Sequence, residues 1–309
     1  MTKGPTRRLW RADRGGSCAC EGEHDHVAVR ETVAAALVAG FLAAPAAQAS
    51  DAGVAALQVA LRHRGLYPAT IDGVDGPATT AAVRRLQARK GLLVDGIAGP
   101  ATRRALGWRG RPRLGARQVR AGMRGWDVAE VQFLLARAGF ASGRIDGEAG
   151  PHFAAALRRY QAWAGIFADG VVGPLTIARL QRAPPLSPLR FRAPVSAATG
   201  DGFGPRGDRF HTGLDFVAGS GAPVAAAGSG CVTFTGYDDG YGLLVVLAHG
   251  SGVTTWYAHL SRIAVRRGDC VAASARIGAV GATGRATGPH LHFEVRVRDA
   301  ATDPRFALS

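Results

Sequence analysis

Few features of this sequence suit a disulfide-rich or membrane-spanning protein. Its 309 residues include only four cysteines, which cannot hold together a scaffold of many disulfides. Its longest apolar run, residues 33–47, is shorter than the roughly twenty residues that a spanning helix needs, and it contains Gly40 and Pro45. These absences leave a globular protein of two or three compact domains as the expectation.

Lysine is also scarce, although positive charge is the strongest bias in the composition. The net charge is +15, and only Lys3 and Lys90 among the 38 basic residues are lysine. Acidic residues are spread through the same segments, and no nucleic-acid recognition module or basic run with interleaved aromatics occurs. We therefore do not expect nucleic acid as a partner, whereas anionic polymers such as those of a cell wall suit this charge.

The first 49 residues have the pattern of a secretory signal. Arginines, Arg30 among them, precede the apolar run, which ends in the small-x-small cleavage pattern Ala47-Gln48-Ala49. We predict that residues 1–49 comprise a signal peptide and an upstream segment. The mature chain would then be secreted to the cell wall or beyond, without a membrane span, as a monomer. A retained membrane anchor is the alternative interpretation.

Two of the four cysteines lie beyond this segment. Cleavage after Ala49 would remove Cys18 and Cys20 and leave Cys231 and Cys270 as the only pair. An oxidising compartment allows this pair a single connectivity, and two buried thiols are the alternative.

A tandem repeat occupies the region that follows. At an offset of 74 residues, Ile71-Asp72-Gly73 aligns with Ile145-Asp146-Gly147, and Leu86-Gln87 aligns with Tyr160-Gln161. Each copy contains two D-G-x-x-G-P turns, in which Asp-Gly permits a positive φ and Pro suits the first turn of a helix. Apolar residues at spacings of three, four and seven also indicate helices. Each copy is thus predicted to be a small bundle of short helices.

Changes of composition divide the chain. An Arg-, Gly- and Pro-rich stretch at 108–118 is interpreted as a linker, and a Pro-rich break follows the second copy. Beyond it, β-rich runs separated by glycine turns occur at 230–235, 242–248, 253–260, 275–280 and 290–297. We predict a multidomain α + β protein with all-α repeats at 50–107 and 118–182, a linker at 183–194, and an all-β antiparallel sheet domain at 195–309.

Two histidines of this last region are expected to share one face of a strand. Polar and apolar residues alternate over 288–297, so the side chains of His290 and His292 leave the same face, together with Glu294 and Arg296. Two imidazoles are therefore predicted to meet at one site.

Three further residues are candidates for the same site. His211 and Asp215 form an H-x-x-x-D pair, and His259 lies in another β-rich run. Together with the histidine pair they contain what a catalytic zinc centre requires. Taken singly, Asp215 could cap a turn and His259 could be a surface or core histidine. The residues alone do not decide which of them would coordinate a metal.

The order and spacing of these motifs resemble the lysostaphin-type zinc endopeptidases, which cut peptides of bacterial peptidoglycan. The resemblance rests on Gly202-Phe203-Gly204-Pro205-Arg206, His211-x-x-x-Asp215, Tyr257-Ala258-His259-Leu260 and Thr287-Gly288-Pro289-His290-Leu291-His292. The two helical copies are similar to the three-helix peptidoglycan-binding domain found beside many wall hydrolases. The resemblance implies that they bind peptidoglycan, and mere spacers are the alternative.

The resemblance also implies a role for each candidate. His211, Asp215 and His292 would bind one zinc ion, while His259 and His290 would be catalytic without coordinating it. Three protein ligands leave a fourth position for water, whose pKa zinc lowers to about 7. Because no H-E-x-x-H motif supplies a glutamate base, the two imidazoles would move the protons.

The expected protein is thus a secreted zinc metalloendopeptidase that hydrolyses peptide bonds of peptidoglycan and is anchored by two repeats. A wall-binding regulator without catalysis and a zinc carboxypeptidase acting on the same peptides are the alternatives. The role of Arg206 stays open, since it could bind a substrate carboxylate or brace its loop. His249 is interpreted as supporting a strand end.

Overall fold

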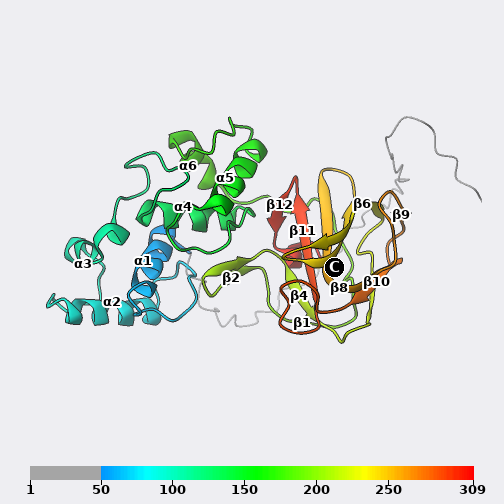
Figure 1. The fold of residues 1–309 in the computed structure, drawn as a ribbon, viewed down its shortest axis with the longest axis horizontal. Helices are drawn as coiled ribbons and strands as arrows, with labels where there is room; N and C mark the ends of the chain where they lie inside the picture. The colour runs from blue at the N-terminus through cyan, green and yellow to red at the C-terminus, as the bar shows by residue number, and fades with distance from the viewer. Residues whose placement is uncertain (1–49) are drawn as a thin grey trace, which may run out of the picture. The chain divides into compact units, whose positions relative to one another are not determined.

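The computed structural model describes residues 50–309, in which a helical region precedes a region of β-strands (Figure 1). The helices are α1 (Ala52–Arg62), α2 (Pro77–Arg89), α3 (Pro100–Ala105), η1 (Gly107–Gly110), α4 (Trp126–Arg137), α5 (Pro151–Trp163), α6 (Pro174–Leu180) and η2 (Pro304–Phe306). This order confirms the predicted α + β class. The predicted signal segment lies outside the described residues, within which no helix is long and apolar enough to cross a membrane.

The sequence repeat becomes a structural repeat of three helices. Helices α1 to α3 form the first repeat and α4 to α6 the second. Four of these helices begin with proline directly after a glycine that has extended backbone, as the D-G-x-x-G-P motif predicts. The exact domain limits proposed from the sequence stay predictions.

A buried glutamine holds each Asp-Gly turn of the repeats. Gln132 is typical, since its Oε1 accepts hydrogen bonds from the backbone of Asp146 (3.0 Å) and Gly147 (2.7 Å). Its Nε2 donates to Asp146 Oδ1 over 2.9 Å. The other three such glutamines are Gln58, Gln87 and Gln161. Each side chain therefore satisfies backbone donors that a tight turn would otherwise leave unpaired.

The two repeats pack on each other, and the stretch between them is partly structured. Trp126, Phe133 and Ile145 of the second repeat belong to the hydrophobic core of the first. The interpretation of 108–118 as a linker without an element is wrong at its start, because η1 continues α3 and ends at the buried Gly110.

The strands form a ten-stranded sheet and a separate two-stranded hairpin. They are β1 (Ala198–Thr199), β2 (Gly204–Arg206), β3 (Arg209–His211), β4 (Leu214–Val217), β5 (Pro223–Ala225), β6 (Gly230–Asp238), β7 (Gly242–Ala248), β8 (Val253–Ile263), β9 (Cys270–Val271), β10 (Arg276–Val280), β11 (Leu291–Val297) and β12 (Ala300–Thr302). The five predicted runs fall on β6, β7, β8, β10 and β11. Neighbouring strands pair antiparallel, and the central order is β4-β11-β8-β7-β6.

One face of the sheet packs into a continuous hydrophobic core. Leu291, Phe293, Val295 and Val297 of β11 all belong to it. The intervening residues of β11 face the other way, which confirms the alternation read from the sequence. The described residues, 50–309, all belong to one compact unit.

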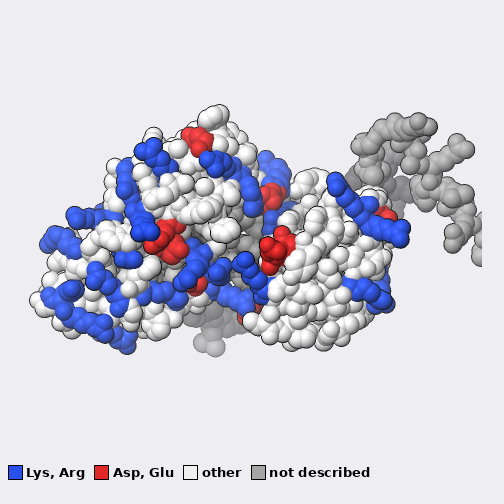
Figure 2. Space-filling view, in the orientation of Figure 1, with Lys and Arg blue, Asp and Glu red and all other residues white. Residues whose placement is uncertain are grey.

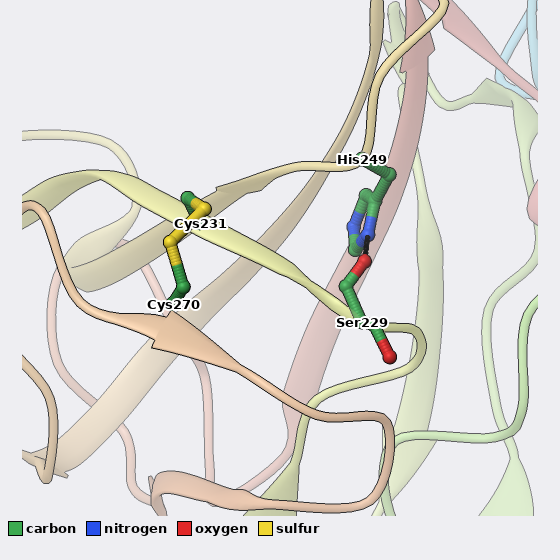
Figure 3. The surroundings of a disulfide bond; sticks show 4 residues. All are labelled: Ser229, Cys231, His249 and Cys270. Carbon is green, nitrogen blue, oxygen red and sulfur yellow. Dashed lines mark hydrogen bonds between the residues drawn. A yellow bond between two sulfur atoms is a disulfide. The ribbon is translucent and has the colours of Figure 1, made fainter. Parts of the chain in front are cut away.

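A disulfide joins β6 to β9. Cys231 and Cys270 are paired with each other, so the disulfide interpretation is confirmed over that of two buried thiols (Figure 3). The same view shows His249 at the end of the β7 region, where its Nδ1 donates to the Ser229 carbonyl over 2.8 Å. Its Nε2 lies 2.6 Å from Thr255 Oγ1. His249 therefore supports a strand end, as predicted.

The basic residues are spread over the surface rather than gathered in one groove of the face in view. Figure 2 shows them in several separate groups, mostly over the helical region, with acidic side chains between some of the groups.

Candidate metal centre and catalytic cleft

Three of the predicted site residues meet at one point. Antiparallel pairing of β4 with β11 places Asp215 directly beside His292, and His211 ends the neighbouring hairpin strand β3. His211 Nε2 lies 2.9 Å from His292 Nδ1 and 3.1 Å from Asp215 Oδ1, and His292 Nδ1 lies 2.9 Å from the same oxygen. All three side chains are buried.

The hydrogen bonds on the far side of each ring fix where its protons lie. His211 Nδ1 faces the Gly202 carbonyl at 2.8 Å and must donate to it, because a carbonyl oxygen only accepts. His292 Nε2 faces the Glu294 carboxylate at 2.9 Å and likewise donates. In the neutral rings, the two nitrogens that face each other therefore carry lone pairs. Two lone pairs and a carboxylate oxygen at this spacing require a cation between them.

The charges of this cluster depend on one another. Burial would raise the pKa of Asp215, but hydrogen bonds with His211 and His292 outweigh it and hold the pKa well below its usual range. Burial would lower the pKa of His292, but hydrogen bonds with Asp215 and Glu294 raise it to about 9. The cluster thus retains positive charge, either a proton or a metal ion, at neutral pH.

The chemistry of the donor set fits zinc. Two imidazole nitrogens and one carboxylate oxygen are ligands that zinc prefers, and three protein ligands are typical of catalytic rather than structural sites. Both histidines also have the outer hydrogen-bond partner that metal-bound histidines usually have, here the Gly202 carbonyl and the Glu294 carboxylate.

Glu294 is a member of the site that sequence analysis placed on the right face without giving it a role. Its Oε1 accepts from Thr212 Oγ1 (2.6 Å) and Tyr241 OH (2.9 Å) as well as from His292. Its Oε2 accepts from Arg296 Nε over 2.6 Å, and the Arg296 guanidinium stacks on Trp256. Burial would raise the pKa of Glu294, but the Arg296 charge and the bond to His292 hold it low. The sequence indicated this role only by placing Glu294 two residues after His292, on the same face of the strand.

The other two predicted histidines face each other beside this cluster. The ring centroids of His259 and His290 are 4.7 Å apart. His259 Nδ1 donates to the Thr283 carbonyl (2.8 Å) and His290 Nδ1 to the Gly288 carbonyl (2.9 Å). The Nε2 atom of each neutral ring therefore keeps a lone pair, and His290 Nε2 lies 3.8 Å from Asp215 Oδ1. Both rings thus present a hydrogen-bond acceptor at Nε2.

An irregular backbone aims His259 at the cleft. The residue has φ of +59°, which is rare for a residue with a side chain. β8 also contains a bulge here, since Leu243 pairs with Leu260 whereas Val245 pairs with Tyr257. Bulges and strained residues are common at functional sites, where they redirect a side chain. Burial lowers the pKa of His259 to about 4.

Gly213, in the middle of the H-x-x-x-D motif, is needed because a backbone carbonyl and a ring approach it closely. A Cβ atom at this position would lie 2.5 Å from the Phe293 carbonyl oxygen and 2.8 Å from Cε1 of the His292 ring. A side chain here would push His292 away from Asp215.

All five predicted residues line one cleft of about 300 Å³. The remaining lining residues are Arg206, Phe210, Thr212, Gly240, Tyr241, Arg285 and Thr287. Arg206 pairs with Asp201, at 3.0 Å between Nε and Oδ2, and its Nη1 lies 3.6 Å from Asp215 Oδ2. Arg206 therefore supports its loop through the ion pair with Asp201, and its guanidinium also lines the cleft.

Comparison with known families supports the resemblance read from the motifs. Residues 209–304 match "Peptidase family M23". Residues 50–106 and 124–180 each match "Putative peptidoglycan binding domain". The chain therefore carries a peptidase M23 domain of lysostaphin type behind two peptidoglycan-binding repeats.

Curated relatives are similar to about a third of this chain. The DD-carboxypeptidase/endopeptidase Mpg of Neisseria meningitidis serogroup B is 47% identical over 96 residues, which are 31% of this chain and 22% of that protein. The peptidoglycan DD-endopeptidase ShyA of Vibrio cholerae is 47% identical over 88 residues, 28% of this chain and 20% of that protein. The chain thus covers only about a fifth of the length of these relatives.

Among solved structures, the catalytic domain of the antimicrobial peptidase lysostaphin from Staphylococcus simulans is 38% identical. The match covers 35% of this chain and 90% of that domain, with a TM-score of 0.34.

Proposed function

We propose that this chain is an exported zinc-dependent endopeptidase that hydrolyses peptide bonds in peptidoglycan stems or cross-bridges. The observation that carries the proposal is the convergence of two imidazole lone pairs and a carboxylate oxygen within 3.1 Å of one another, beside two further histidines that do not join them. A purely structural zinc site would use a fourth protein ligand and would have no need of the spare bases.

In this proposal His211 Nε2, His292 Nδ1 and Asp215 hold one zinc ion. When bound, zinc lowers the pKa of a water molecule to about 7 and polarises the scissile carbonyl. The outer partners Gly202 and Glu294 orient the two rings, so that each presents the nitrogen that has a lone pair.

His259 and His290 move the protons. A water proton passes to an Nε2 lone pair while the water oxygen bonds to the carbonyl carbon. The protonated ring then stabilises the negative charge on the carbonyl oxygen and delivers the proton to the leaving amine as the carbon–nitrogen bond breaks. The carbonyls of Thr283 and Gly288 keep both rings in the tautomer that this cycle needs.

The substrate follows from the matched families. The relatives named above are described as a DD-carboxypeptidase/endopeptidase and a peptidoglycan DD-endopeptidase, and the same chain carries two peptidoglycan-binding repeats. Two weak binding modules tethered to an enzyme raise its effective concentration on an insoluble polymer. We assign 50–107 and 118–182 to these modules and 195–309 to the catalytic domain. A wall substrate supports a location outside the cytoplasm.

The test is mass analysis of the fragments released from purified peptidoglycan by the purified chain, with a chelator and with His259→Ala. New amino termini inside cross-linked fragments are expected, and both the chelator and the substitution should abolish them. Release of single terminal amino acids would favour a carboxypeptidase instead. Unchanged walls in the presence of bound zinc would contradict the proposal and favour a wall-binding regulator.

A further inference from the structure

Both repeats contact the hairpin that carries His211. β2 and β3 pair only with each other among the described strands, and their connection is Gly207-Asp208. Ile71 N donates to the Gly207 carbonyl over 2.8 Å, and Ile145 N donates to the Asp208 carbonyl over 2.7 Å. Ile71 and Ile145 are equivalent positions of the two repeats. The same turn of each repeat therefore binds one of two successive carbonyls at the hairpin tip.

Side chains strengthen this contact. Gly207 N donates to Thr70 Oγ1 over 3.3 Å, and Arg144 Nη2 lies 2.7 Å from Asp208 Oδ2. Since the hairpin belongs to no larger sheet among the described residues, these contacts are a principal support of its tip. The two strands that leave the tip contain Arg206 and the candidate ligand His211.

The second repeat also holds the hairpin β11–β12, whose first strand carries His292. Trp163 Nε1 donates to the Val297 carbonyl over 3.2 Å, and Ala301 N donates to the Gly139 carbonyl over 3.2 Å. Ala300 is fully buried within the hydrophobic core of the second repeat. Gly139 has φ of +87°, and a Cβ atom there would collide with the backbone of Ala301. The backbones touch, so this contact leaves no room for a side chain.

We propose that the two repeats form a mount for the metal centre. One docking point fixes the hairpin of His211 and the other fixes the hairpin of His292, so that docking holds the two imidazole nitrogens at the spacing that one ion requires. The inference rests on the proposed function in one respect, namely that the two histidines are taken as zinc ligands. It adds a positioning role to repeats whose matched family points only to polymer binding.

The physical reason is that the two ligand strands belong to different sheets. β3 continues into β4 through Thr212 and Gly213, and β4 pairs with β11, so the backbone path from His211 to His292 passes from the small hairpin into the main sheet. Fixing both hairpins on one body removes their relative motion before the ion binds, which improves affinity through preorganisation.

The test uses the full chain and a matched pair of substitutions, Gly139→Ala and Gly143→Ala. Both glycines lie in the second repeat with positive φ, +87° and +90°, so both substitutions strain the backbone alike. Only Gly139 faces the backbone of β12, whereas nothing lies within 4 Å of a Cβ atom at Gly143. A difference between the variants therefore reports on docking rather than on the repeat itself.

Three quantities would be measured on each variant: hydrogen exchange at the amides of Ile71 and Ile145, zinc affinity by competition with a chromogenic chelator, and kcat and KM on a soluble cross-linked muropeptide. For Gly139→Ala we expect faster exchange, a zinc affinity about tenfold weaker, as for loss of an outer support of a metal site, and a fall in kcat with little change in KM. Gly143→Ala should match the wild type, and both variants should still bind insoluble peptidoglycan.

A milder variant covers the case in which Gly139→Ala does not fold. Asp208→Arg should weaken zinc binding by about two- to threefold because an exposed ion pair contributes little, and the charge swap Arg144→Asp with Asp208→Arg should restore it. Faster exchange with unchanged zinc affinity and kcat would overturn the proposal, and so would rapid exchange at both amides in the wild type. A wild type that binds zinc but cuts no peptide would refute the proposed function. The comparison of zinc affinities between the variants would still test the positioning role.

Discussion

The repeats and the metal centre both bury polar side chains, but the buried glutamines of the repeats have matched hydrogen-bond partners, whereas the metal centre leaves two ring nitrogens unmatched. Each glutamine of an Asp-Gly turn has its donor and its acceptor matched, as Gln132 shows with the backbone of Asp146 and Gly147. At the metal centre, the inner nitrogens of the two rings have no matched donor. His211 Nε2 and His292 Nδ1 both carry lone pairs and face each other at 2.9 Å. Matched groups stabilise a fold, whereas unmatched ones demand a ligand.

Two buried glutamates make the same contrast. Glu130 accepts from Trp126 Nε1 and from the backbone of Leu114, and burial raises its pKa. Glu294 is fully buried, but the Arg296 charge and the bond to His292 hold its pKa low, so it faces a candidate ligand as an anion. Burial by itself does not mark a functional residue. A functional role is indicated when the buried group keeps its charge and directs it at a candidate ligand.

The largest effect should come from removing the carboxylate of the metal centre. Asp215→Ala takes away the oxygen that both imidazole nitrogens face. We expect zinc content to fall from one ion per chain to near zero and kcat/KM to fall by about a thousandfold or more. Elemental analysis and muropeptide hydrolysis would check this, with thermal unfolding as the control for folding. A variant that keeps its zinc and its activity would contradict the ligand assignment.

A matched pair of conservative substitutions tests the two glutamates. Glu294→Gln keeps the shape but removes the charge that orients His292, so zinc affinity should weaken by about 10- to 100-fold. Glu130→Gln should leave zinc affinity at the wild-type value, because its partners lie within the repeat region.

Competition with a chelator measures both variants. If Glu294→Gln were too unstable, Tyr241→Phe would remove a single hydrogen bond to the same carboxylate. Equal zinc affinities for the two glutamine variants would show that the charge of Glu294 does not support the site.

The smallest effect concerns His249, a histidine of the same β region whose two nitrogens are both engaged. Burial lowers its pKa in the folded state, so below the ordinary pKa near 6.5 the unfolded chain binds more protons. The contribution of neutral His249 is therefore present above this pH and is lost as the pH falls below it.

Urea unfolding at pH 7 and pH 5 would show this dependence, and His249→Gln should narrow the difference between the two stabilities. An unchanged difference in the variant would mean that other groups cause the loss at low pH.

Much of the fold was readable because local rules were strong. The offset repeat and its D-G-x-x-G-P turns predicted a bundle of short helices in each copy, and the alternation over 288–297 predicted which residues of β11 face the core. The stretch at 108–118 misled because Gly and Pro indicate turns without telling whether the backbone of Gly110 becomes buried. The role of Glu294 was missed because its partners Thr212 and Tyr241 lie in the connections before β4 and β7, far from β11 in the sequence.

The amino-acid order by itself determined the helices, the strands and the residue types available for a metal, since these depend on spacings within a few residues. Only the tertiary structure decided that His211, from a small hairpin, meets His292, from the main sheet, and that two equivalent turns of distant repeats bind the tip of that hairpin. These meetings depend on which strands pair and in which register, and no local pattern specifies a partner that lies 81 residues away.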